Sequence, residues 1–141
     1  MRFWDSSAVV PLVVAEIASD QLGELADDAT PMYVWWATRV EVTAAVARRE
    51  RADVRRDADW SACFRSLNEE AETWREVGPA DLVRQIAERM LRRHDLRAGD
   101  SLQLAAALVA CDDRPAGQEF VCLDDRLRRA AAIEGFSLLP P

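Results

Sequence analysis

Strand-like and helix-like segments alternate along the whole chain, and this alternation limits the possible folds more than any other feature. Short runs rich in apolar and β-forming residues lie at positions 1–5, 32–36, 73–77, 120–123 and 136–139. Helical patterns lie between them, around 18–27, 38–50, 53–71, 79–95, 99–112 and 125–133. Strands that alternate with helices are typical of a parallel sheet covered by helices. We therefore predict an α/β fold with a central, mainly parallel sheet of four to five strands.

Length and composition predict a single domain over residues 1–141, because half of the residues are hydrophobic and can form one core. No run approaches the roughly 18 uninterrupted apolar residues that a membrane span needs. Asp5 comes too early for the apolar stretch of a signal peptide. We therefore expect a cytoplasmic protein with no membrane contact.

The charged residues exclude several kinds of chemistry. All 18 basic residues are arginines, so the chain has no lysine for a P-loop, a Schiff base or a receiver-like phosphoryl site. The only histidine, His94, lies in an arginine-rich segment where we expect an exposed helix end. The three cysteines include no CxxC pair, which disfavours a zinc site.

The formal net charge of −7 argues against a simple electrostatic nucleic-acid binder, which would normally be basic. The arginines are nevertheless clustered, in the segments 48–56 and 84–97. Acidic residues are interspersed in both segments. The clusters are therefore either solvated helix faces or sites of phosphate contact, and the sequence leaves both interpretations open.

Two aspartates each follow a predicted strand: Asp5 follows the first run, and Asp124 follows the run 120–123. In a parallel sheet both would project from the carboxyl edge, where open α/β folds bind ligands. Glu41 and Asp100 begin helical segments that could reach the same crevice. Four converging carboxylates would repel one another unless a hard divalent cation neutralised them. We call these four residues the acid cluster.

Each of these acids also has a purely structural interpretation. Asp5 and Asp124 could be N-caps of the helices that follow them, and Asp125 competes with Asp124 for either role. Thr38 and Glu41 fit a capping box. Asp100 could cap its helix or benefit from the helix dipole.

The same residues resemble the motifs of the PIN-domain family, and more narrowly those of VapC-type toxin ribonucleases. The resemblance covers essentially the whole chain and is carried by four segments in order: 3–10, 38–42, 96–107 and 120–131. These contain Asp5, Glu41, Asp100 and Asp124 respectively. At the fourth segment the family usually has threonine or serine two residues before the aspartate, whereas this chain has Cys122.

The resemblance implies a PIN-like three-layer α/β/α fold and Mg²⁺- or Mn²⁺-dependent cleavage of RNA phosphodiester bonds. It implies that the acid cluster is catalytic and holds the metal, directly or through water. Ser6 or Ser7 would orient Asp5 or contact the phosphate, unless they serve as helix caps; Asp125 is a further supporting candidate. The implied partners are an RNA substrate, a cognate VapB-like antitoxin that places a basic side chain in the acidic pocket, and a second copy in a homodimer. The alternatives are a non-catalytic PIN-like binding module and a metal-dependent DNA nuclease of the same fold.

Overall fold

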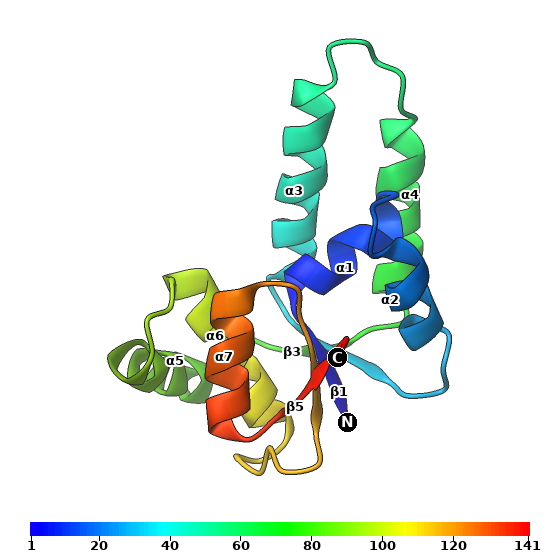
Figure 1. Cartoon of the computed structure of the whole chain (residues 1–141). Helices are drawn as coiled ribbons and strands as arrows, with labels where there is room; N and C mark the ends of the chain where they lie inside the picture. The colour runs from blue at the N-terminus through cyan, green and yellow to red at the C-terminus, as the bar shows by residue number, and fades with distance from the viewer.

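A five-stranded parallel sheet forms the centre of the protein in the computed structural model, which describes residues 1–141 (Figure 1). Its order is β3-β2-β1-β4-β5, and every neighbouring pair is parallel. The strands are β1 (Arg2–Trp4), β2 (Met32–Trp35), β3 (Arg75–Val77), β4 (Glu119–Val121) and β5 (Ser137–Leu139). The predicted α/β class, the parallel sheet and its five strands are confirmed.

Seven helices cover the two faces of this sheet, which gives the predicted three layers. They are α1 (Ser6–Val13), α2 (Ser19–Ala26), α3 (Thr38–Ala52), α4 (Trp60–Ala71), α5 (Asp81–Arg93), α6 (Ala98–Ala110) and α7 (Asp125–Glu134). Residues of α1 to α4 pack on one face and residues of α5 to α7 on the other. In Figure 1, α3 and α4 extend side by side away from the sheet as a helical hairpin. None of the helices combines the length and the apolar character that a membrane crossing requires.

The central strands β1, β2 and β4 are largely buried on both faces, because successive side chains point to opposite sides of the sheet and helices cover both sides. Phe3 and Phe120 stack against each other, with ring centroids 5.5 Å apart, in the core beneath α5 to α7. Their neighbours Trp4 and Val121 lie in the core beneath α1 to α4. Strands buried on both faces explain why short apolar runs without polar alternation predicted this sheet.

The helix predicted over residues 53–71 begins only at Trp60, which corrects the sequence interpretation. Asp53 ends α3, and its carboxylate accepts a hydrogen bond from the Trp60 indole at 2.8 Å. Arg56 has a positive φ of 54°, which an α-helix does not allow. Asp59 then caps α4 by accepting from the Ala62 N–H. This charged segment is therefore a folded loop that joins the two helices of the hairpin.

A charged side chain is buried at the amino edge of the sheet. Arg2, within the run that sequence analysis treated as strand-forming, is only 6% exposed. It pairs with Glu119 at 2.8 Å and Asp28 at 2.6 Å, and this pairing lowers the pKa of Asp28 to about 2. Asp28 is therefore a structural partner of Arg2.

Candidate metal and substrate site

The carboxyl edge of the sheet carries a cavity of about 520 Å³, which we call the acid-lined cavity. All four residues of the acid cluster line it, although they come from four different parts of the chain. The remaining lining residues are Ser6, Ser7, Val10, Glu16, Ala44, Ala45, Arg48, Arg49 and Arg97. Asp125, the competing candidate, does not line it.

The topology explains this convergence. The chain leaves β1 towards β2 on one side and later returns to β4 on the other side of β1. The crevice therefore opens where the strand order reverses, at the carboxyl ends of β1 and β4. The Asp5 N–H donates to the Val121 carbonyl at 2.9 Å, which holds these two strand ends together.

Asp5 is the most buried acid of the cluster, with 4% exposure. It is also the N-cap of α1, because its Oδ2 accepts from the Ser7 N–H at 2.9 Å. Burial raises the pKa of Asp5 to about 6, and the nearby Glu41 charge adds to this rise. A carboxylate held charged in such a place benefits from a cation beside it.

Glu41 is held by a residue that sequence analysis missed. Gln103 of α6 is 1% exposed, and its Nε2 donates to Glu41 Oε2 at 2.8 Å and to Thr38 Oγ1 at 3.1 Å. The capping box predicted for Thr38 and Glu41 is wrong, because the N-cap of α3 is Ala37 and the Ala37 side chain makes no capping hydrogen bond. The only signal in the sequence was one amide within the otherwise apolar run 102–108.

Asp100 and Asp124 form the other side of the cluster. Asp100 lies in the first turn of α6, and burial together with the Asp124 charge raises the pKa of Asp100. Asp124 is exposed and caps α7, because its Oδ1 accepts from the Leu127 N–H at 2.8 Å. The cap role and the cavity position therefore coexist in the same side chain.

Cys122 occupies the position where the resembling family usually has a hydroxyl. Its thiol lies 3.6 Å from Asp5 Oδ2, 3.6 Å from Ser7 Oγ and 3.3 Å from the Asp124 N–H. Burial and the Asp5 charge raise the pKa of the Cys122 thiol, so it stays protonated and donates. Ser7 Oγ also accepts from the Leu123 N–H at 2.9 Å. Cys122 and Ser7 thus tie together the two chain segments that carry Asp5 and Asp124.

The donor set fits a hard divalent cation in its chemistry. Asp5, Glu41 and Asp124 each use one carboxylate oxygen for the protein hydrogen bonds described above, and their second oxygens have no hydrogen-bond donor from the protein. No three Asp, Glu, His or Cys side chains are arranged to hold an ion between them directly. Mg²⁺ takes only one or two carboxylates directly and keeps several waters, so an open cavity of this size suits it.

His94 and the second large cavity lie apart from these acids. The His94 side chain is buried, not exposed as expected, and its Nε2 lies 2.6 Å from Glu134 Oε1. It does not line the acid-lined cavity, so it is no partner for a nucleophile there.

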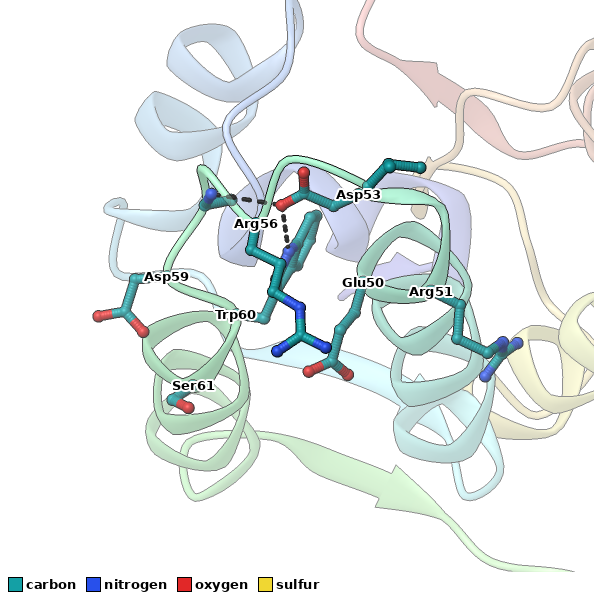
Figure 2. A pocket seen from close by; sticks show the side chains of 9 residues that line it. Glu50, Arg51, Asp53, Arg56, Asp59, Trp60 and Ser61 are labelled. Atoms are coloured by element: carbon teal, nitrogen blue, oxygen red, sulfur yellow. Dashed lines mark hydrogen bonds between the residues drawn. The ribbon is translucent and has the colours of Figure 1, made fainter.

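The second cavity, of about 640 Å³, lies at the tip of the α3–α4 hairpin, where Figure 2 shows Arg56 and Glu50 beside Trp60.

Comparison with solved structures identifies proteins of the same fold. A toxin–antitoxin complex from Klebsiella pneumoniae matches with a TM-score of 0.63 and 12% identity, over 88% of this chain and 87% of that chain. VapBC2 from Rickettsia felis, bound to a DNA fragment from its promoter, matches with a TM-score of 0.66 and 8% identity, over 97% of both chains. FitAcB from Neisseria gonorrhoeae matches with a TM-score of 0.60 and 13% identity, also over 97% of both chains.

No protein-family model matches the sequence, and no curated protein matches it. The similarity is therefore one of fold. It confirms the PIN-like three-layer architecture that the resemblance implied.

Proposed function

We propose that this chain is the toxin of a VapBC-type toxin–antitoxin pair and cleaves RNA phosphodiester bonds with Mg²⁺ or Mn²⁺. The observation that carries this proposal is the acid-lined cavity, in which four carboxylates from separate elements meet at the switch point of the sheet. The shared fold with a toxin–antitoxin complex and with VapBC2 supports the biological role.

Asp5, Glu41, Asp100 and Asp124 would hold the metal, directly or through water. When bound, the ion would activate a water for attack and neutralise charge on the phosphate. Gln103 and the cap hydrogen bonds fix one oxygen of three of these acids, which directs their second oxygens to a ligand. Cys122 and Ser7 would keep Asp5 in position, while Ser6 and Ser7 lie in the cavity wall where a phosphate would bind.

The decisive experiment is a cleavage assay with single-stranded RNA and DNA oligonucleotides of the same sequence. We expect RNA to be cut with Mn²⁺ or Mg²⁺, and no cleavage with a chelator. Asp5→Asn and Asp100→Asn should each reduce the rate at least a thousandfold while the circular dichroism spectrum stays unchanged. Undiminished activity in both variants would refute the site, and faster cleavage of DNA would indicate a DNA nuclease.

A non-catalytic binding module is the second candidate. Asp5 and Asp124 serve as helix caps, and no three acids hold an ion directly in the present arrangement. This alternative predicts no metal-dependent cleavage of either nucleic acid. The same assay therefore separates the two candidates.

The proposed partners have their own tests. Expression of the chain should arrest the growth of host cells, and co-expression of the protein encoded beside it, the proposed antitoxin, should restore growth. Light scattering of the purified protein should give twice the chain mass of 15.8 kDa if it forms the proposed homodimer.

A further inference from the structure

Two arginines of the acid-lined cavity make no ion pair. Arg48 lies on α3 and Arg97 immediately precedes α6, and both side chains are exposed. Neither makes an ion pair or a side-chain hydrogen bond within the protein. The third arginine of the cavity differs, because Arg49 pairs with Glu16 and donates to the Ala45 carbonyl. The guanidinium groups of Arg48 and Arg97 therefore line the cavity with hydrogen-bond donors that the protein itself does not use.

The position of Arg48 suits an extended anion better than local neutralisation of the acids. Arg48 is seven residues after Glu41, which is two helical turns, or about 10.5 Å along the same face of α3. Stabilising partners on a helix lie three or four residues apart, so Arg48 is too far along α3 to pair with Glu41. Ala44 and Ala45 lie between them in the cavity wall and leave the path unobstructed. Arg97 lies on a different element of the cavity wall, at the start of α6. Its charge acts on Asp100, but the two side chains form no ion pair, so the Arg97 guanidinium keeps its donors for a ligand.

We propose that Arg48 and Arg97 bind the phosphates on either side of the one to be cleaved, so that a single RNA strand crosses the cavity from α3 to α6. This inference rests on the proposed function. A metal ion compensates charge only at the central phosphate, whereas the neighbouring phosphates would meet a chain of net charge −7. A guanidinium forms paired hydrogen bonds to phosphate oxygens, which makes arginine well suited to these positions. Such contacts position the strand without reading its sequence.

The test measures RNA binding by the purified protein and by Arg48→Ala, Arg97→Ala and the double variant. The probe is a fluorescent single-stranded 12-nucleotide RNA of mixed sequence, with Ca²⁺ in place of Mg²⁺ and its integrity checked on a gel. Each substitution should raise Kd about tenfold, as expected for loss of one charged hydrogen bond. Each should also make the slope of log Kd against log salt shallower by about 0.7.

Arg92→Ala is the matched control, because Arg92 is exposed on α5, makes no ion pair and lies outside the cavity. It should leave both Kd and the salt slope unchanged. In cleavage assays with Mg²⁺, the loss in the Arg48 and Arg97 variants should appear mainly as a higher KM.

The outcomes separate this inference from the proposed function. RNA binding that depends on Arg48 and Arg97 without any cleavage would support their phosphate contacts and refute the nuclease. Cleavage by a protein whose affinity and salt slope survive both substitutions would overturn the inference alone. Absence of RNA binding would also overturn it. Equally tight binding of polyglutamate that is lost in the same variants would overturn it too, because the arginines would then bind an acidic protein segment.

Discussion

At the scale of single residues, Asp5, Glu41 and Asp124 each combine one carboxylate oxygen that is hydrogen-bonded within the protein with a second oxygen that is not. Asp5 shows the consequence most clearly, because its cap bond to Ser7 keeps a charge in a buried position. Aspartate is favoured at helix N-caps, so the sequence also allowed Asp5 and Asp124 to be caps, and both are caps in the structure. This capping preference could not exclude the cavity role, because a carboxylate has two oxygens and a cap uses one.

Asp5→Asn should change how stability depends on pH. The pKa of Asp5 is about 6 in the folded protein and about 3.9 in the unfolded chain. Between these values the folded state binds more protons, so its stability falls as the pH rises from about 4 to about 6 and stays low above that. Asparagine keeps the cap without the charge and should be more stable at pH 7 by up to about 3 kcal/mol.

The measurement is urea unfolding in the presence of a chelator at pH 4 and pH 7. Asp57→Asn, which removes a charge from an exposed loop, is the control and should retain the fall in stability. An Asp5→Asn variant that loses as much stability as the parent over this range would contradict burial as the cause.

Gln103 should act on the metal through Glu41. Gln103→Met keeps the length of the side chain and removes both donors to Glu41 and Thr38. Under the proposed function, loss of this supporting bond should weaken Mn²⁺ binding by about ten- to a hundredfold. Unfolding stability should fall by no more than about 1 kcal/mol, because removal of the buried Gln103 Oε1, which has no partner, offsets part of the cost of leaving Thr38 Oγ1 without its donor.

Calorimetric titration with Mn²⁺ measures this effect. Ser101→Ala is the control on the same helix: it removes a buried hydroxyl that bonds the Ala98 carbonyl and does not touch Glu41. An equal loss of Mn²⁺ affinity in both variants would mean that Gln103 has no specific role.

At the scale of elements, one side chain of α7 adds to the pairing of β4 with the C-terminal strand β5. Arg128 donates to the Cys122 carbonyl at 2.8 Å, the Leu139 carbonyl at 3.1 Å and the Pro140 carbonyl at 2.8 Å. These bonds join the end of β4, which leads to Asp124, to the end of β5. The Arg128 guanidinium therefore connects the two strand ends close to the acid-lined cavity.

Arg128→Met should lower the free energy of unfolding by about 2 kcal/mol, because it leaves these carbonyls without their charged donor. Urea unfolding measures the loss. Arg129→Met is the neighbouring control, since Arg129 is exposed and makes no ion pair, and it should change stability by less than about 0.5 kcal/mol. Equal losses in the two variants would show that the bonds of Arg128 contribute nothing specific.

Element types could be predicted because strands buried on both faces and amphipathic helices have local patterns. The boundary at residues 53–59 could not, because no glycine or proline interrupts that charged segment. Two aspartates mark this boundary in the structure. Asp53 is the C-cap of α3 and accepts a hydrogen bond from the Trp60 indole, and Asp59 is the N-cap of α4. The Thr38–Glu41 capping box was wrong for a different reason, because α3 already includes Thr38 and has Ala37 as its N-cap. The Glu41 carboxylate instead accepts from Gln103, 62 residues further along the chain.

At the scale of the whole molecule, the order of strands decides which acids meet. The sequence predicted that Asp5 and Asp124 lie at strand ends, but only the sheet order puts β1 beside β4. The sequence could not distinguish Asp124 from Asp125 as the fourth acid, whereas in the structure only Asp124 lines the cavity. The clustering of the arginines was visible in the sequence, whereas the lack of ion pairs at Arg48 and Arg97 was not.

The assembled cavity should make the stability of the whole protein depend on divalent metal. An unfolded chain does not gather the four acids, so an ion that binds them stabilises only the folded state. At a concentration one hundred times its Kd, Mg²⁺ or Mn²⁺ should add about 2.7 kcal/mol and raise Tm by several degrees. Thermal scans need NaCl of matched ionic strength as the control, because salt also screens the repulsion among the acids. Asp100→Asn should lose the metal-specific part of the shift. A rise of equal size with NaCl, or in the Asp100→Asn variant, would show that general screening and not a bound ion stabilises the fold.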